Sequence, residues 1–589
     1  MTIKFKPYFL ALGAILFLKL IATVSSTLGF NIIDTPDQLL LISLFTICAL
    51  FILSFTVHYA AERTPIPPFV IAIFFGIAGQ YFFAPLLAHN EILQIIVGLG
   101  ATLILFGGGL ETPFRSFKKL SGHILSLSSL GLLITAFLFS LLLVYISNVV
   151  GLPVSQPIAL ILGAVLASTD PAAIIPTLKG LRFARKEVKD IIISESAITD
   201  VFGTLLSVIF LAIIVSDQMH NISIVSAYQQ LMSFDTLRFL SKEVVVGVSL
   251  GLFGYGLLHL LYLLKKKTSK ECEVDSAVFL FIPIFVFTSA LFLGGSGYLA
   301  AFIAGLLFHV TDHLRETETF FNHIVDGFFK PTIFIILGAM VNISSLLEYA
   351  WVGLIISLLF IFVIRPLAVA ISLGLFVCKS NPFITIKDLI FISWVRETGV
   401  IPAVLLVSIV SMGAVGFEAL IPIGTWVILT TLIVQPIATP WLAKRLGVAE
   451  SISDHTNISH YISQQQTSVL ATRGKSFLRR LHDVYTWSHS HNIKKIIILL
   501  CLEENYSTKK VAQLQQQTNQ EFERIKGLFG EDDQEMELQI ISRKGFLQKN
   551  LQELAKEDVN ISAFFVGKRM LDYKLEEIKQ IQIPFYFMD

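Results

Sequence analysis

Long apolar runs separated by short polar stretches fill most of the chain. Each run is long enough to cross a bilayer, which takes about 20 residues. The run at 8–30 has no small-residue cleavage site, so we expect a retained helix and not a signal peptide. In all, about 13 to 14 membrane-spanning helices are predicted, at 8–30, 38–60, 67–84, 92–112, 122–149, 156–178, 190–216, 238–264, 275–294, 298–312, 327–345, 347–377, 388–411 and 420–443.

The pattern changes after residue 446, where polar residues take over. We predict a transmembrane domain over 1–446, a linker over 447–490 and a small cytoplasmic α/β domain over 491–589, because apolar and charged stretches alternate there. The expected strands are Ile496–Leu502, Glu537–Ile541, Ile561–Val566 and Pro584–Met588, and the expected helices lie near 509–529, 546–556 and 571–581. No glycine-rich phosphate loop follows a strand, so a regulatory role is favoured and any ligand of this domain stays unknown.

Composition supports a polytopic membrane protein. The 589 residues are 54% hydrophobic and 15% charged, with a mean hydropathy of +0.73, which is too apolar for soluble globules. The net charge of +1 gives no basic field for nucleic acid. Lys and Arg gather on every second loop, and the positive-inside rule then predicts a multi-pass protein of the cell inner membrane with both termini cytoplasmic.

A proline interrupts the predicted helix 156–178 near its middle. Pro171 follows Thr169 and Asp170, and a proline removes a backbone donor and disfavours helical geometry in the residue before it. Broken helices at mid-membrane provide free backbone oxygens for cation sites in transporters. The alternative is a simple proline kink in which Asp170 caps the second half of its own helix.

The predicted helix 190–216 carries two carboxylates, Glu195 and Asp200, within one and a half turns. Ser196 and Asp200 share a face, whereas Glu195 and Asp200 are about 140° apart around the helix. Different roles follow from this geometry. Glu195 needs a fixed cationic partner, because an unpaired buried charge is costly, and Asp200 is the candidate for exchangeable ligand binding.

Two arginines are candidate partners for that glutamate. Arg365 lies in one apolar run, and Arg396 precedes Glu397 and Gly399 in the run 388–411, which glycine and proline interrupt. Together with the first interruption, this gives one broken helix in each half of the chain. Inverted repeats built around a midplane site leave such a pattern.

These residues resemble a known family over roughly residues 35–445, the monovalent cation/proton antiporters of the sodium/proton exchanger type. The resemblance implies an all-α bundle of inverted repeats with two crossing broken helices, and a homodimer embedded in membrane lipid. It rests on these motifs in this order: Ser168-Thr169-Asp170-Pro171, Glu195-Ser196-x-x-Thr199-Asp200, Arg365 and Arg396-x-x-Gly399.

The resemblance also implies roles for individual residues. Asp200 becomes the carboxylate that binds the cation or a proton, and Glu195 pairs with Arg365. Thr199 stands where the family commonly has Asn or Asp, and a site with no carboxylate at that position indicates electroneutral exchange. The remaining members of the site and of the breaks are Thr169, Asp170, Ser196, Pro171, Arg396, Glu397 and Gly399.

The expected function is therefore antiport of a monovalent cation and H+ by alternating access, with a role in pH homeostasis and no cofactor. Na+ is favoured as the cation. The alternatives are a K+/H+ efflux antiporter gated by the cytoplasmic domain, a proton-uncoupled cation channel, and a membrane sensor. An enzyme is disfavoured, since no Ser/His/Asp arrangement, metal cluster or phosphate loop is present in the sequence.

Overall fold

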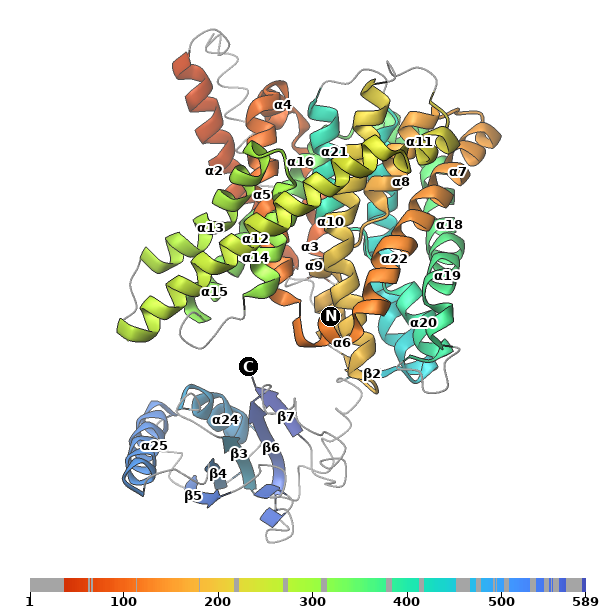
Figure 1. The fold of residues 1–589 in the computed structure, drawn as a ribbon. Coiled ribbons are helices and arrows are strands. Elements are labelled where there is room, and N and C mark those ends of the chain that lie inside the picture. Colours follow the sequence, from red (N-terminus) through yellow and green to blue (C-terminus); the bar gives the residue numbers. More distant parts are fainter. Residues whose placement is uncertain are drawn as a thin grey trace. The chain divides into compact units, whose positions relative to one another are not determined.

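The chain divides into two compact units, Met1–Ser451 and Ile452–Asp589 (Figure 1). The predicted span 8–30 and the predicted helix 571–581 lie outside the described residues. The structure is a computed structural model that describes residues 36–588 except 62–63, 65–66, 113, 180, 217–221, 269–273, 309–314, 378–383, 413–417, 452–466, 473–477, 491–492, 494, 503–507, 530–535, 545–549, 552, 555–560 and 568–584.

In its described residues, the first unit is helical apart from two short strands. Its first half contains α2 (Pro36–Ala61), α3 (Pro68–Ala78), α4 (Gln80–Ala88), α5 (Asn90–Glu111), α6 (Phe114–Ser126), the π-helical segment η1 (Leu127–Gly131), α7 (Leu132–Val150), α8 (Gln156–Leu166), α9 (Pro171–Lys179), β1 (Leu181–Phe183), α10 (Lys186–Ser216), α11 (Ile224–Leu231) and α12 (Phe234–Thr268). Its second half contains α13 (Val274–Phe292), α14 (Gly297–Leu307), α15 (Arg315–Ile324), η3 (Val325–Phe329), α16 (Lys330–Met340), α17 (Ile343–Glu348), α18 (Ala350–Leu359), η4 (Phe360–Ile364), α19 (Arg365–Val377), α20 (Ile386–Trp394), α21 (Val400–Ser411), α22 (Leu420–Leu446) and β2 (Ala449–Ser451).

Many of these helices have the length and composition of membrane spans. In the described part of the chain, seven helices are long and apolar enough to cross a membrane, or eight if the bent pair Pro68–Ala78 and Phe82–Ala88 is one span. Shorter apolar helices of 10–17 residues accompany them and include α8, α14 and α21. The predicted span 67–84 corresponds to this bent pair, because the chain turns at Gly79 between α3 and α4.

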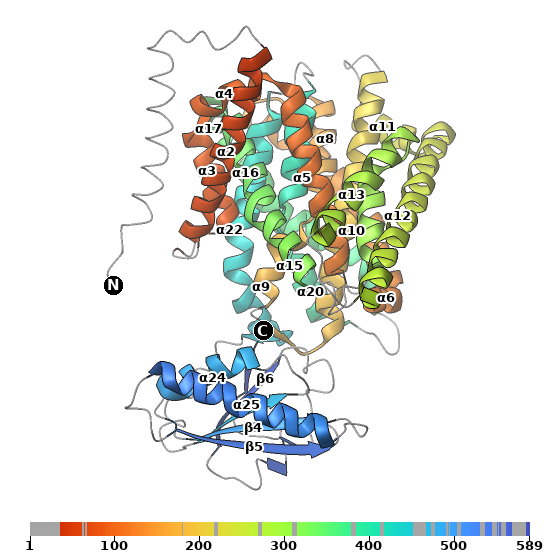
Figure 2. The ribbon, with the colours of Figure 1, turned by 90° about the vertical axis from the view of Figure 1, so that its left-hand side faces the viewer.

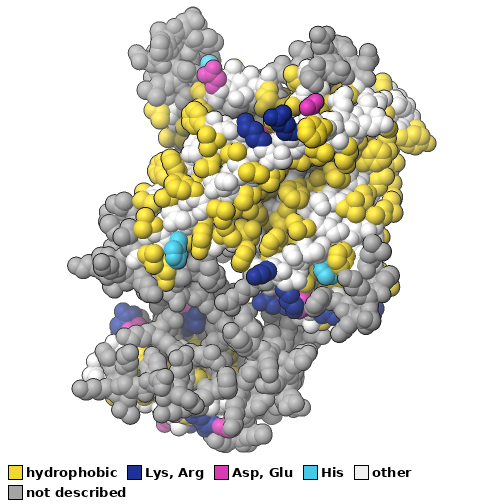
Figure 3. Space-filling view, viewed as in Figure 1, with side chains coloured by type: hydrophobic (Ala, Val, Ile, Leu, Met, Phe, Trp, Pro, Cys, Tyr) yellow, Lys and Arg dark blue, Asp and Glu magenta, His cyan; other side chains and the backbone are white. Residues whose placement is uncertain are grey.

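The outer surface of this unit is apolar. Figure 3 shows hydrophobic side chains spread over the face on which α12 lies, with Lys and Arg gathered toward its edges. Large apolar side chains of α12 are exposed there, among them Val245, Leu252, Phe253 and Leu260. Exposed apolar surface of this extent marks a membrane-facing protein, which agrees with the predicted polytopic class.

A reciprocal glycine contact packs α5 closely against α14. A Cβ atom added at Gly109 would overlap the main-chain oxygen of Phe302, and one added at Gly305 would overlap that of Phe106. Small residues allow membrane helices to approach closely. The contact fixes the end of α5, and therefore the position of Glu111.

The last strand of the first unit forms a two-stranded antiparallel ribbon. Leu181–Phe183 of β1 pairs with Ala449–Ser451 of β2, and the Ala184 N–H donates to the Val448 carbonyl at 2.9 Å. The strand β1 joins α9 to α10, so the end of the unit is hydrogen-bonded to the connection between these two helices.

The second unit contains a five-stranded sheet in the order β5-β4-β3-β6-β7, and all four strand pairs are parallel. Helices α24 and α25 cover one face of this sheet (Figure 2), where their apolar side chains pack against β3, β4 and β6. This arrangement confirms the predicted α/β class. The elements are β3 (Thr467–Thr472), α24 (Leu478–Ser490), β4 (Lys495–Leu502), α25 (Thr508–Phe529), β5 (Glu537–Lys544), β6 (Ile561–Gly567) and β7 (Phe585–Met588).

The range predicted as a linker, 447–490, instead contains regular structure. It includes β2, β3 and α24, and β3 is the central strand of the sheet. All six residues of β3 are buried, because a central parallel strand is covered on both faces. The Thr- and Ser-flanked sequence of 467–472 hides this role, since its polar residues interrupt the apolar run expected of such a strand.

Candidate functional site

The first break interrupts the helix that carries Asp170. α8 ends at Leu166, residues 168–170 are not helical, and α9 begins at Pro171. Proline suits the first position of a helix but disfavours helical geometry in the residue before it. Residues 168–170 are fully buried, so their polar groups need partners inside the protein.

The second break supplies such partners. α20 ends at Trp394, residues 395–399 are not helical, and α21 begins at Val400. The Asp170 N–H donates to the Glu397 carbonyl at 3.2 Å, and the Val400 N–H donates to Asp170 Oδ2 at 2.7 Å. Asp170 therefore caps α21, where the helix N-terminus favours a negative charge.

The two breaks meet at close range because residue 399 is glycine. A Cβ atom at Gly399 would overlap the Asp170 side chain. The hydroxyl groups of Thr398 and Thr431 form a hydrogen bond beside this contact. The fold class thus includes two broken helices in contact at their breaks. Asp170 Oδ2 bonds the opposite broken helix, while the Asp170 carbonyl accepts from the Ile174 N–H in the first turn of α9.

Asp200 lies on α10 beside the first break. The residue is 2% exposed, and among the described residues its Oδ1 has no hydrogen-bond partner. The Ser168 side chain interacts with the same carboxyl group. A buried acceptor without a donor is costly, so this oxygen is available to a proton or a cation.

Glu195, on the same helix, lies in a fixed ion pair. Its Oε1 accepts a hydrogen bond from Arg365 Nη2 at 3.0 Å, and each side chain is 1% exposed. Arg365 is the first residue of α19 and follows η4. Such a pair neutralises two charges that would be expensive to bury separately.

Arg396, the other candidate partner of Glu195, makes different contacts. Its Nη1 donates to Thr135 Oγ1 at 3.4 Å, and its Cζ lies 5.5 Å from the centre of the Phe360 ring. Its Nε and Nη2 atoms have no hydrogen-bond partner in the described part of the chain. The direct ion pair of Glu195 is therefore with Arg365.

Two of the three predicted hydroxyl residues hold the first break against α10. Thr169 Oγ1 and Thr199 Oγ1 share a hydrogen bond at 2.8 Å, and the Thr169 N–H donates to Thr199 Oγ1 at 3.3 Å. The Ser196 hydroxyl is buried without a partner among the described residues. None of these three residues lines the cavity described next.

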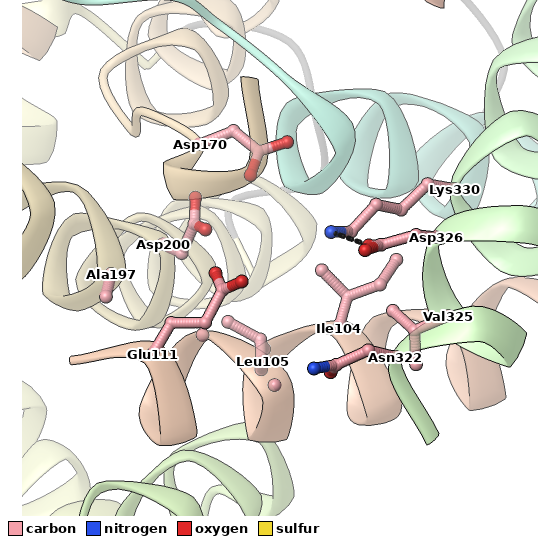
Figure 4. Close-up of a pocket in the computed structure, with 12 residues that line it drawn as sticks. Ile104, Leu105, Glu111, Asp170, Ala197, Asp200, Asn322, Val325, Asp326 and Lys330 are labelled. Atoms are coloured by element: carbon pink, nitrogen blue, oxygen red, sulfur yellow. Dashed lines mark hydrogen bonds and ion pairs between the residues drawn. The ribbon is translucent and has the colours of Figure 1, made fainter. Parts of the chain in front are cut away.

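A small cavity joins the two aspartates to side chains from other helices (Figure 4). Its volume is about 20 Å³, and about 10–15 Å³ is enough for one water molecule. In Figure 4 the carboxyl groups of Asp170, Asp200 and Glu111 lie on one side of the cavity, with Lys330 and Asp326 on the other. The lining residues are Ile104, Leu105, Gly107, Gly108, Glu111, Asp170, Ala197, Asp200, Asn322, Val325, Asp326 and Lys330.

Four polar lining residues were absent from the predicted site: Glu111, Asn322, Asp326 and Lys330. Glu111 ends the glycine-rich stretch of α5, and the other three come from α15, η3 and α16. A usable signal existed for Lys330, because it lies inside the predicted span 327–345 and ionisable residues in spans are usually functional. No sequence spacing links these residues to Asp200.

Two broken helices in contact, inside an apolar helical unit with helices long enough to cross a membrane, define a multi-pass membrane protein. Residues 47–445 match the family model described as "Sodium/hydrogen exchanger, transmembrane". The chain belongs to this family.

Relatives with known names agree with this assignment. The chain is 30% identical over 359 residues to the K(+)/H(+) antiporter NhaP2 of Shewanella sp. (strain ANA-3), which covers 60% of this chain and 58% of that relative. It is 26% identical over 370 residues to the Na(+)/H(+) antiporter 1 of Methanocaldococcus jannaschii, which covers 59% of this chain and 79% of the relative. The chain therefore spans less than two thirds of the length of the first relative.

A solved structure has the same fold. The sodium proton antiporter MjNhaP1 from Methanocaldococcus jannaschii superposes with a TM-score of 0.52 at 22% identity, over 68% of this chain and 99% of that one. This likeness concerns the fold alone. It supports the predicted bundle with broken helices.

Proposed function

We propose that this chain is a secondary active antiporter that exchanges a monovalent cation for H+ by alternating access. It is a transporter and not an enzyme, and it needs no cofactor. One observation carries the proposal: Asp200 is buried beside the contact of two broken helices, and its Oδ1 has no hydrogen-bond partner among the described residues. Family membership supports the same activity.

In the proposed mechanism, Asp200 holds either a proton or the cation, but not both. A buried charge without compensation is costly. The part of the protein that carries Asp200 therefore moves across the membrane only when a proton or a cation neutralises the carboxylate. Each crossing cation is then exchanged for a proton. Asp170 supplies a second carboxylate to the cavity while its Oδ2 remains hydrogen-bonded to α21.

Thr169, Ser196 and Thr199 have a different part in this proposal. Thr169 and Thr199 keep the first break against α10 through their hydrogen bonds, and Ser196 is the remaining candidate for a direct ligand because its hydroxyl is buried without a partner in the described part. Pro171 and Gly399 shape the two breaks.

Na+ and K+ remain the two candidate substrates. The sequence motifs favour Na+, whereas the relative at 30% identity is named as a K(+)/H(+) antiporter. The more distant archaeal relative is named for Na(+)/H(+). We propose one-for-one, electroneutral exchange in either case, because Thr199 provides no second carboxylate next to Asp200.

The proposal extends to assembly and location. We propose a homodimer in the cell inner membrane with both termini cytoplasmic, and a regulatory role for the second unit. The distribution of Lys and Arg over alternate loops supports this topology.

The decisive experiment measures acridine-orange dequenching in everted membrane vesicles after addition of Na+, K+ or Li+. Asp200→Asn should abolish the response to every cation at unchanged expression. Glu187→Gln is a matched control on the same helix, because the Glu187 side chain is 30% exposed and pairs with Lys119 outside the cavity. Retained exchange in Asp200→Asn would remove this residue from the mechanism.

A further inference from the structure

A lysine side chain lies in the same cavity as Asp200. Lys330 is the first residue of α16, its side chain is 11% exposed, and it forms an ion pair with Asp326 four residues earlier. The Asp326 side chain is 52% exposed. The ammonium group is thus largely buried, while its partner reaches solvent.

The surroundings of Lys330 include four carboxylates. Its charge interacts with those of Asp326, Glu111 and Asp170, and Asp200 interacts with it in turn. All four carboxylates line the cavity. The helices α3 and α21, which also pack on α16, contain no Asp, Glu, Lys, Arg or His.

An ion pair between residues four apart on a helix surface contributes little to stability, and it forms without burial of the lysine. Burial of an ammonium group in a membrane protein is expensive and marks an ion pathway. The cavity has room for about one water molecule beside this group. An entering cation therefore comes to lie close to a charge of the same sign.

We propose that the Lys330 ammonium competes with the transported cation for the carboxylates of this cavity. This inference rests on the proposed antiport function. In the cation-free state the amine offsets the negative charge of Glu111, Asp170 and Asp200, which are called the inner carboxylates below. When a cation enters, the amine stays with Asp326 at the exposed edge. The long, flexible lysine stem allows a small displacement of this kind.

The competing explanation is purely structural, namely that the Lys330–Asp326 pair joins η3 to α16. The two explanations predict different effects of removing each partner. If the pair only supports the fold, Lys330→Gln and Asp326→Asn change transport in the same direction. If Lys330 competes with the cation, removal of the lysine and removal of its outer partner act in opposite directions.

The test measures the cation concentration that gives half-maximal exchange in everted vesicles, with Na+, K+ and Li+ each in turn. Lys330→Gln should lower this concentration by about tenfold, since one repelling charge is removed from a partly screened cavity. Asp326→Asn should raise it, because the freed amine then turns to the inner carboxylates. Lys330→Arg keeps the charge and should stay within about twofold of the wild type.

An unchanged or higher half-maximal concentration in Lys330→Gln would overturn the proposal, and so would a shift of both variants in one direction. Should Lys330→Gln be poorly produced, Lys330→Met removes the same charge at similar volume and takes its place in the comparison with Asp326→Asn. Asp200→Asn is run in parallel. If it still exchanges cations, the antiport mechanism itself has failed, whatever the lysine variants do.

Discussion

Glu195 and Asp200 lie five positions apart on one helix and are equally buried, at 1% and 2% exposure, yet their surroundings differ. The Glu195 carboxylate is 3.0 Å from the Arg365 guanidinium. Asp200 Oδ1 has no hydrogen-bond partner among the described residues and faces a cavity. A turn and a half of helix therefore separates a compensated charge from one that needs an exchangeable partner.

The difference shows how one helix can serve both stability and transport. Removing one member of a buried ion pair leaves the other without compensation, which is strongly destabilising. Removing the Asp200 carboxylate, which a proton or a cation must neutralise, leaves no buried charge without its partner. Substitutions at the two positions should then separate the loss of folding from the loss of exchange.

The largest stability effect is expected for Glu195→Gln, which leaves Arg365 buried without its anion. We expect a loss of about 3–5 kcal/mol, seen as a lower melting temperature and yield of the full chain purified in detergent. Asp200→Asn is the matched carboxylate-to-amide control and should melt near the wild type. A normal yield of Glu195→Gln with lost exchange would contradict a structural role for this pair.

Replacing both members of the pair should cost much less. The double variant Glu195→Met with Arg365→Met removes both charges at similar volume, and such replacements are often neutral or stabilising. Its melting temperature should recover most of what Glu195→Gln loses. If the double variant is as unstable as the single one, Arg365 supports the fold through contacts other than this carboxylate.

The smallest effect is expected at Thr199, next to Asp200 on the helix. Thr199→Val removes the hydroxyl that bonds the Thr169 main chain and side chain, at a cost of about 1 kcal/mol. The order of activity with Na+, K+ and Li+ should not change. Thr199→Ser keeps the hydroxyl and should match the wild type in melting temperature. A changed ion order in Thr199→Val would make Thr199 a direct ligand, as the motif comparison implies.

The sequence was most informative where burial is costly. Pro171 and Gly399 interrupt apolar runs, and Glu195, Asp200 and Arg365 place charges inside them, so each of these residues stands out against its surroundings. The structure brings both breaks together and forms the Glu195–Arg365 pair. The sequence did not predict that Asp170 caps the opposite broken helix.

The remainder of the cavity was not predictable from local pattern. Glu111 and Asp326 each lie near an end of an apolar run, where charged residues are ordinary, and only the packing of α5 and η3 turns them toward Asp200. The central strand 467–472 was missed for a similar reason. Its burial comes from its neighbours in the sheet, whereas its own sequence is mixed in polarity.

The ribbon of β1 and β2 has a mechanical consequence. The ladder joins residues 449–451 to residues 181–183, and the latter connect α9, which starts at the first break, to α10, which carries Asp200. Any tension applied along the chain beyond Ser451 must either drag this connection or tear its hydrogen bonds. A pull on the chain beyond Ser451 therefore acts first on the connection between α9 and α10.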